Sequence, residues 1–267
     1  MSKIITGQLQ KMTHKAEKPI QYFLNLNDQS YSLTPKVGHQ VTLRYRGVIT
    51  CIECGRKIKK TYSDGYCFPC ARDLPENDIC SVRPEKCQHD KGNEADREFY
   101  EKYCNIDHFV YLSQTSGVKV GITRHYNIPS RWIDQGAVKA LIIAKVPSRI
   151  LSGQIEVVLA KKISDKTNWR KMLLGNIGDV DFSTIREKMI QYIPKDLRQY
   201  ALHEEEVQSF TYPVQSVPSK ISSHNLDKES EFTEKLTGIK GQYLIFENRV
   251  INLRKYSGYH IEFVFKE

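Results

Sequence analysis

Short apolar runs separated by turn residues characterise the first 50 residues. The runs at 6–12, 20–26 and 41–45 are β-branched or aromatic, and residues 27–28 and 36–38 have the composition of turns. Runs of this length are typical of strands rather than helices. The pattern therefore predicts a small antiparallel β segment over residues 1–50.

Two further apolar runs follow in the middle of the chain, at 109–112 and 118–122. They flank a polar stretch at 114–117 that is typical of a hairpin loop. A third apolar run at 140–146 reads as a buried strand. These segments predict a small sheet.

Helices are predicted around that sheet. Pro129 is suited to the first turn of a helix that ends at Gly136. Ser148 can cap a second helix whose apolar positions recur with a 3.6-residue period. Ser183 can cap a third helix that runs to Ile193. Strands and helices are thus mixed in this part of the chain.

The C-terminal part returns to strands. Residues 204–230 are acidic and then rich in Ser, Pro and Lys, which indicates a linker, and apolar runs at 241–246, 250–253 and 259–265 predict a three-strand meander. The predicted fold class is mixed, α+β. Its four parts are an N-terminal antiparallel β segment (1–50), a cysteine-rich zinc-binding module (51–108), an α/β core (109–203) and a linker with a C-terminal β meander (204–267).

Composition narrows the class of protein. Of 267 residues, 40% are hydrophobic and 27% charged, which favours a globular chain over a disordered one. No apolar run reaches the ~20 residues of a membrane helix, and the N-terminus lacks the apolar core of a secretory signal. We therefore expect a cytoplasmic protein with no membrane partner. The sequence does not determine its oligomeric state.

The net charge of +9 and the pI near 9.1 favour a polyanionic partner, nucleic acid first, either DNA or RNA. Many soluble proteins are equally basic, so charge alone does not identify a nucleic-acid-binding protein.

The cysteines point to a metal. Two C-x-x-C pairs, Cys51/Cys54 and Cys67/Cys70, are separated by a predicted hairpin. A two-residue gap lets both thiolates of a pair reach one tetrahedral ion at about 2.3 Å. An iron–sulfur cluster or a redox pair is the alternative, but the chain has no thioredoxin-like context here. We therefore expect structural zinc bound in a zinc ribbon.

A second metal site is a further hypothesis. Cys80, Cys87 and Cys104 remain, with His89 and His108 nearby, and three thiolates plus one imidazole would complete a tetrahedral site. The alternative is that these are buried free cysteines.

Basic residues between the two cysteine pairs are candidate phosphate contacts. Arg56, Lys57, Lys59 and Lys60 lie on the predicted hairpin, close to the aromatic Tyr62, Tyr66 and Phe68. Cations can hold phosphates while aromatic rings stack on bases. The alternative is that these basic side chains are simply solvated on the surface and contact no partner. Arg124 is a further candidate contact to nucleic acid.

Residues 110–124, VYLSQTSGVKVGITR, together with Arg131-Trp132 and a later helix that carries Glu156, resemble the GIY-YIG endonuclease superfamily. In that superfamily two strands carry the GIY and YIG elements, an arginine opens the next helix, and a glutamate on a later helix binds a divalent metal. The resemblance places Tyr111 on the first tyrosine and Lys119-Val120-Gly121 on the YIG element.

The resemblance implies metal-dependent cleavage of phosphodiester bonds. Glu156 would hold Mg²⁺ or Mn²⁺, Arg131 would face the developing charge, and Tyr111 would position or activate water. An ordinary exposed helix glutamate is the alternative for Glu156. Lys119 stands where catalytic members have a second tyrosine, as in a phage-associated branch with a KxG motif. Gln135 stands where some members have a histidine.

Almost the whole chain also resembles an uncharacterised prokaryotic family. The matching segments are 51–56, 65–70, 83–85, 119–124, 131–137 and 238–244. Relatives tend to have a further cysteine where this chain has Glu94, which bears on the ligands of a second metal.

Three functions follow as expectations. The first is a zinc-binding protein that interacts with nucleic acid, with or without a divalent-metal-dependent endonuclease activity. The second is a non-catalytic, zinc-dependent module that binds nucleic acid or protein. The third is an RNA-modifying enzyme in which Cys80 or Cys104 is reactive.

Overall fold

The computed structural model describes residues 2–88, 91–175 and 177–266, and the chain divides into two compact units. Unit 1 comprises Met1–Arg72 and Phe210–Glu267, and unit 2 comprises Asp73–Ser209. Unit 2 is therefore an insertion in the sequence of unit 1. The predicted cysteine-rich module at 51–108 spans this boundary, so the first four cysteines belong to unit 1 and the last three to unit 2.

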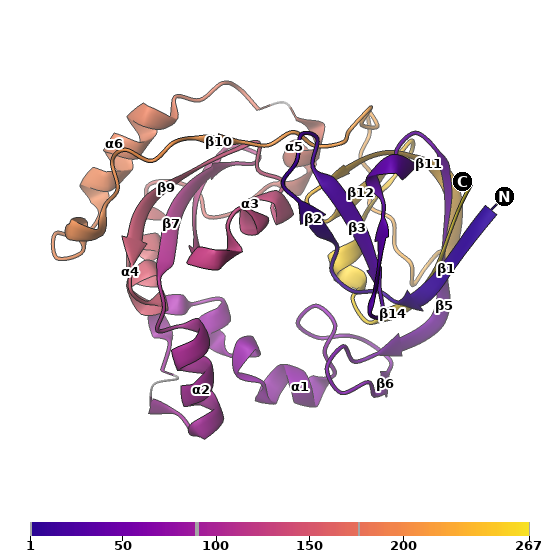
Figure 1. The fold of residues 1–267 in the computed structure, drawn as a ribbon, viewed down its shortest axis with the longest axis horizontal. Coiled ribbons are helices and arrows are strands. Elements are labelled where there is room, and N and C mark those ends of the chain that lie inside the picture. Colours follow the sequence, from indigo (N-terminus) through magenta and orange to yellow (C-terminus); the bar gives the residue numbers. More distant parts are fainter. Residues whose placement is uncertain (1, 89–90, 176, 267) are drawn as a thin grey trace. The chain divides into compact units, whose positions relative to one another are not determined.

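Unit 1 is built on antiparallel sheets (Figure 1). The larger is seven-stranded, with the order β1-β14-β5-β11-β12-β13 and with β6 paired to β5, and the smaller has the order β2-β3-β4. The strands are β1 Ser2–Gln8, β2 Thr13–Lys15, β3 Gln21–Leu26, β4 Gln29–Ser32, β5 Gln40–Thr50, β6 Lys57–Ile58, β11 Glu231–Lys240, β12 Tyr243–Phe246, β13 Val250–Asn252 and β14 Tyr259–Lys266.

The predicted strands at 20–26, 41–45 and 259–265 are confirmed as β3, part of β5 and most of β14. The strand expected at 6–12 instead ends at Gln8, and β11 was not expected. The predicted N-terminal segment and C-terminal meander also share one sheet, because β14 pairs with both β1 and β5. A local pattern shows that a run is a strand but does not show which distant strand it pairs with.

A buried amide joins the two ends of the chain in unit 1. The Gln242 side chain accepts a hydrogen bond from the Met12 N–H and donates one to the Met12 carbonyl, both at 3.1 Å. Gln242 is 3% exposed and Met12 1%. Since unpaired buried backbone groups are costly, this contact holds the segment between β1 and β2 against β12.

Unit 2 has an antiparallel sheet of the order β10-β9-β7-β8. Its strands are β7 His108–Gln114, β8 Val118–Arg124, β9 Lys139–Val146 and β10 Gln208–Ser209. Its helices are α2 Glu94–Tyr103, α3 Ser130–Asp134, α4 Arg149–Leu159, α5 Trp169–Leu174 and α6 Phe182–Tyr192, while α1 Phe68–Asp73 lies at the boundary between the units. The mixed α+β class and the predicted β7–β8 hairpin are confirmed.

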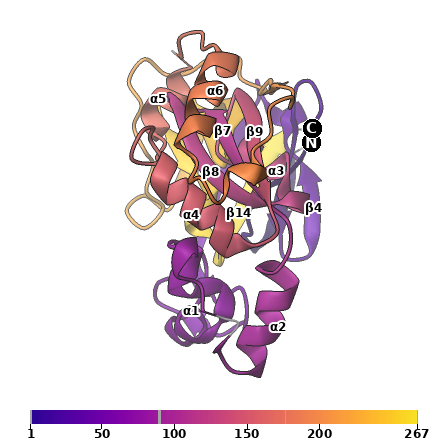
Figure 2. The ribbon, with the colours of Figure 1, turned by 90° about the vertical axis from the view of Figure 1, so that its left-hand side faces the viewer.

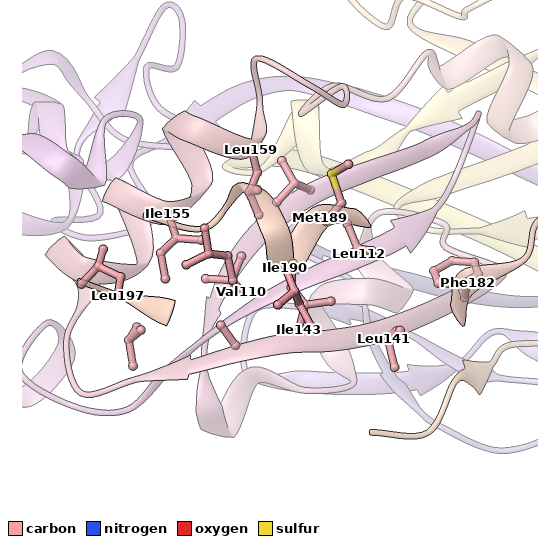
Figure 3. Close-up of a cluster of buried hydrophobic side chains, with 14 residues drawn as sticks. Val110, Leu112, Leu141, Ile143, Ile155, Leu159, Phe182, Met189, Ile190 and Leu197 are labelled. Atoms are coloured by element: carbon pink, nitrogen blue, oxygen red, sulfur yellow. The ribbon is translucent and has the colours of Figure 1, made fainter. Parts of the chain in front are cut away.

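Helices α4 and α6 pack on one face of this sheet (Figure 2). Apolar side chains from β7, β9 and both helices form its core (Figure 3). Val110 and Leu112 of β7 point into this core, and Ile155 and Leu159 of α4 meet them. Because side chains alternate along a strand, Tyr111 is directed to the other face.

The predicted caps are confirmed in one helix and corrected in another. Ser148 caps α4, with its hydroxyl accepting from the Leu151 N–H. Helix α6 begins two residues earlier than expected, because Asp181 rather than Ser183 is its cap. The Asp181 carboxylate accepts from the backbone N–H groups of Ser183 and Thr184, which makes it the stronger acceptor at this helix end.

A buried histidine predicts how the stability of unit 1 depends on pH. The His224 side chain is 2% exposed, its Nδ1 lies 2.9 Å from Arg249 Nη1, and its Nε2 lies 2.9 Å from the Glu229 carbonyl. Burial, and then the Arg249 charge, lower the pKa of His224. Protonation of His224 would place a second positive charge beside Arg249. It would also turn Nδ1, which accepts a hydrogen bond from Arg249 in the neutral ring, into a donor.

The unfolded chain therefore binds a proton at His224 more readily than the folded chain does, and unit 1 loses stability as pH falls below about 6.5. In His224→Gln this loss should be smaller. Thermal unfolding midpoints of the wild type and the variant, measured from acidic to neutral pH, would check this prediction. If the midpoints of both proteins fell equally with decreasing pH, His224 would not be the group responsible.

Candidate functional site

Unit 1 holds a four-cysteine group at the end of β5. The sulfurs of Cys51, Cys54, Cys67 and Cys70 all lie within 4.8 Å of one another. Cys51 and Cys67 are buried, Cys70 is half-buried and Cys54 is exposed. Four thiolates at this spacing could hold a metal such as zinc, as the sequence predicted.

Local backbone geometry brings the two C-x-x-C pairs together. Gly55 has φ +68°, a left-handed conformation that closes the first turn, and its N–H donates to the Cys51 carbonyl at 3.0 Å. Tyr62 and Tyr66 exchange two backbone hydrogen bonds of 2.8 Å, which closes the hairpin before the second pair. The Cys67 N–H then donates to the Cys51 sulfur at 3.2 Å.

The electrostatics of this group favour an ionised Cys51. Burial acts to raise the pKa of its thiol, but hydrogen bonds from the backbone of Cys54 and Cys67 outweigh burial and lower the pKa to about 6. A hydrogen bond to Cys67 and burial raise the pKa of Cys70 to about 12. A divalent cation would allow all four thiols to ionise together.

The predicted basic run lies on the ribbon surface. Arg56, Lys57, Lys59 and Lys60 are all exposed. The Lys60 ammonium lies 5.0 Å from the centre of the Tyr62 ring, which meets the Phe68 ring edge-on at 5.5 Å. Phe68 itself is 55% exposed.

A pocket of about 390 Å³ adjoins this run. Lys60 lines it together with Arg254 and Lys255, which follow β13 almost 200 residues later. Arg254 forms a 2.8 Å ion pair with Asp64 of the ribbon. Sequence reasoning missed Arg254 and Lys255, because no local pattern relates them to the ribbon.

Unit 2 holds the second group of predicted site residues. Tyr111 on β7 stands directly opposite Gly121 on β8. A β-carbon at position 121 would lie 2.6 Å from the Tyr111 hydroxyl, so only glycine leaves room for the phenol there. The hydroxyl donates to Gln135 Oε1 at 3.1 Å, and the ring packs edge-on against Trp132.

Charged residues surround this phenol. Arg131 of α3 interacts electrostatically with Tyr111, and both Arg131 and Lys119 of β8 interact electrostatically with Glu156 of α4. The structure therefore brings Tyr111, Lys119, Arg131 and Glu156 into one cluster, which we call the Tyr111 cluster. Asp165 acts on both Lys119 and Glu156. Sequence reasoning missed Asp165, which lies in an exposed loop without a recognisable pattern.

Burial sets the protonation of the cluster. It lowers the pKa of Lys119 to about 8, with the Arg131 charge acting in the same direction. It also raises the pKa of Glu156 and that of Tyr111, although Arg131 opposes both shifts. Tyr111 is fully buried, whereas Arg131 and Glu156 are half-buried and reach solvent.

The remaining predicted residues fall elsewhere in unit 2. Cys80, Cys87 and Cys104 are buried together, and His89 lies outside the described residues. His108 donates from Nδ1 to the Ile106 carbonyl at 2.8 Å, and burial lowers its pKa to about 4. Arg124 donates to the Tyr103 carbonyl at 3.0 Å and stacks over the Tyr103 ring.

A family model described as a protein of unknown function, DUF2797, matches residues 38–261. The chain belongs to the DUF2797 family. The match covers parts of both units, including the four-cysteine group and the Tyr111 cluster. No curated protein and no solved structure matches the chain. Membership of the family therefore assigns no activity.

Within the described part of the chain, none of the helices has the length and apolar character needed to cross a membrane.

Gly121→Ala tests the geometry of the Tyr111 cluster. The added methyl group would meet the Tyr111 hydroxyl and ring, so we expect a loss of stability of about 1–3 kcal/mol from overpacking. Chemical denaturation would measure it. Gly117→Ala in the loop between β7 and β8 is the control, because its β-carbon would meet nothing within 4 Å. Equal effects of the two changes would contradict the packing described.

Metal removal tests the four-cysteine group. A structural zinc site of this kind contributes on the order of 10 kcal/mol to folding, so chelation should unfold the ribbon. Cys51 and Cys67, 1% and 2% exposed, should then react with an alkylating reagent. Mass spectrometry of labelled peptides would detect the change. Equal labelling with and without chelator would show that no metal protects these thiols.

Proposed function

We propose that this protein binds nucleic acid through unit 1 and cleaves phosphodiester bonds, with a divalent cation, at the Tyr111 cluster of unit 2. The observation that carries the proposal is the cluster itself. It gathers a carboxylate, a guanidinium, an ammonium and a phenol from four separate elements. The resemblance of these residues to the GIY-YIG superfamily supports it further.

The distribution of charge supports nucleic-acid binding by unit 1. Unit 1 contains 20 lysines and arginines against 11 acidic residues, whereas unit 2 contains 20 of each. The whole surplus of +9 therefore belongs to unit 1. Since phosphate contacts dominate affinity for nucleic acid, the partner is expected on this unit.

The ribbon surface provides two kinds of contact. Arg56, Lys57, Lys59 and Lys60 offer exposed cations, and the pocket with Arg254 and Lys255 adds two more. The exposed Phe68 ring offers a surface on which a base could stack. This combination suits a single strand with unstacked bases better than a closed duplex.

The Tyr111 cluster has the donors that a hard cation prefers. Glu156 provides a half-buried carboxylate, and Asp165 adds a second negative charge beside it. Mg²⁺ and Mn²⁺ favour carboxylate oxygens and retain several waters, so one or two carboxylates suffice. Such an ion supplies Lewis-acid stabilisation of charge on the phosphoryl group.

The other side chains of the cluster would stabilise charge and hold one another in position. Arg131 reaches solvent beside Glu156 and would face the negative charge that develops on the phosphate oxygens. Tyr111 is fully buried and its raised pKa keeps the phenol protonated, so it would orient Arg131 and Gln135 rather than act as a base. Lys119 would add a buried positive charge near Glu156.

Cleavage tests the catalytic half of the proposal. Labelled single-stranded and duplex DNA and RNA would be incubated with Mg²⁺ or Mn²⁺ and with wild type, Glu156→Gln or Gln154→Ala. Gln154 is exposed on the same helix and is the matched control. We expect Glu156→Gln to lower the rate by about 10²- to 10³-fold, a typical cost of losing one group that stabilises charge. Equal cleavage by all three proteins would defeat the assignment.

Binding measured over a range of salt concentrations tests the proposal that unit 1 binds nucleic acid. Lys57→Glu with Lys59→Glu in unit 1 should weaken binding and flatten the salt dependence, because fewer counterions are released. Lys161→Glu with Lys162→Glu makes the same charge change at exposed residues of unit 2 and should have a smaller effect. Equal losses from the two double variants would remove the ribbon from the proposal.

A non-catalytic nucleic-acid-binding protein is the second candidate. The complete burial of Tyr111 and the lysine at position 119 favour it, and binding without cleavage would identify it. The RNA-modifying alternative has less support, because Cys80 and Cys104 are 2% and 1% exposed, whereas reactive thiols are usually accessible.

A further inference from the structure

Three cysteines of unit 2 converge from separate segments. Cys80 lies in a 3-10 turn at Ile79–Ser81, Cys87 follows a second turn at Pro84–Lys86, and Cys104 ends helix α2. They are 2%, 6% and 1% exposed and form one buried cluster. The Cys87 thiol lies close enough to those of Cys80 and Cys104 to raise the pKa of both.

The segment that carries these cysteines has almost no hydrophobic core. Among its described residues between 73 and 107, only Pro84 and the three cysteines are buried. Ile79 and Val82, which could have formed a core, are 56% and 79% exposed. Its regular structure consists of α2 and short 3-10 turns. Segments that bury so little apolar surface usually depend on a metal or a disulfide for stability.

We propose that Cys80, Cys87 and Cys104 form a second structural metal site, which takes a soft divalent cation such as zinc. The three thiolates fill three of four tetrahedral positions and leave one for a nitrogen or oxygen donor. On binding, each thiol gives its proton to solvent as its sulfur bonds to the cation, with no change of oxidation state.

The surroundings fit such a centre. Arg149, the first residue of α4, donates from Nη2 to the carbonyls of Cys80 and Ser81 at 3.0 and 3.3 Å. Its backbone N–H donates to the Cys104 carbonyl at 2.8 Å. One residue thus holds two of the three ligand segments, the first through its side chain and the second through its backbone, and its positive charge would balance a site in which thiolates exceed the charge of the ion.

The same contacts tie the site to helix α4. Gly153, one turn into α4, packs against the turn between Cys80 and Cys87, where a β-carbon would lie 2.5 Å from the Glu85 nitrogen. Helix and turn therefore pack without a gap. A metal that fixes the cysteine segment also fixes the N-terminal half of α4.

Metal content of the full-length protein tests the proposal. Elemental analysis after purification and dialysis should give two ions per chain, one in the ribbon and one here. Cys80→Ser and Cys104→Ser should each retain one ion, as should Cys51→Ser with Cys54→Ser in the ribbon. Combining Cys80→Ser with the ribbon double variant should leave none. Circular dichroism would verify that each variant is folded.

Two measurements on the wild type avoid the risk that a variant unfolds. Cobalt substitution should give thiolate charge-transfer absorption for seven sulfurs, four from the ribbon and three from this site. Hydrogen exchange of the α4 amides should accelerate when metal is removed. One ion per chain would overturn the proposal, as would a mass that shows a disulfide between two of the three cysteines. Neither outcome depends on cleavage or on nucleic-acid binding.

Discussion

The pairing of β5 with β14 is the interaction on which most of unit 1 depends. It joins residues 40–50 to residues 259–266 by antiparallel hydrogen bonds and lets unit 2 occupy the sequence between them. The ribbon begins directly after β5, and Thr50 donates its N–H to the Gly258 carbonyl at 2.9 Å. A β-carbon at Gly258 would lie 2.6 Å from the Thr50 carbonyl, so the two segments could not approach so closely with any residue other than glycine at position 258. This contact places Arg254 beside the ribbon.

The insertion also separates two kinds of chemistry. The surplus of positive charge is confined to unit 1, while unit 2 has a balanced charge and buries Lys119 near the carboxylates of Glu156 and Asp165. Exposed lysines are suited to phosphate contacts, since their charge costs little in water. A buried lysine is different, because burial disfavours its charged form, and Lys119 is tolerated through the opposing charges of Glu156 and Asp165.

Each unit has one segment in which cysteines are clustered. The ribbon and the segment at 73–107 bury few large apolar side chains. Cys51 and Cys67 of the ribbon, and all three cysteines of the segment, are among the most buried residues there. A thiolate–metal site can replace a hydrophobic core because its bonds are strong and fix several backbone segments at once. In unit 2 the Arg149 contacts connect that arrangement to α4, which also carries Glu156.

The sequence by itself determined the elements whose causes are local. The C-x-x-C spacing identified the four-cysteine group, the apolar runs identified β7, β8 and β9, and Ser148 marked the start of α4. A motif resemblance also named Tyr111, Arg131 and Glu156. Only the tertiary structure decided which strands pair across 200 residues, that Arg254 lies by Lys60, and that Asp165 joins the cluster. These depend on contacts between distant segments, and a local pattern contains no information about its partner.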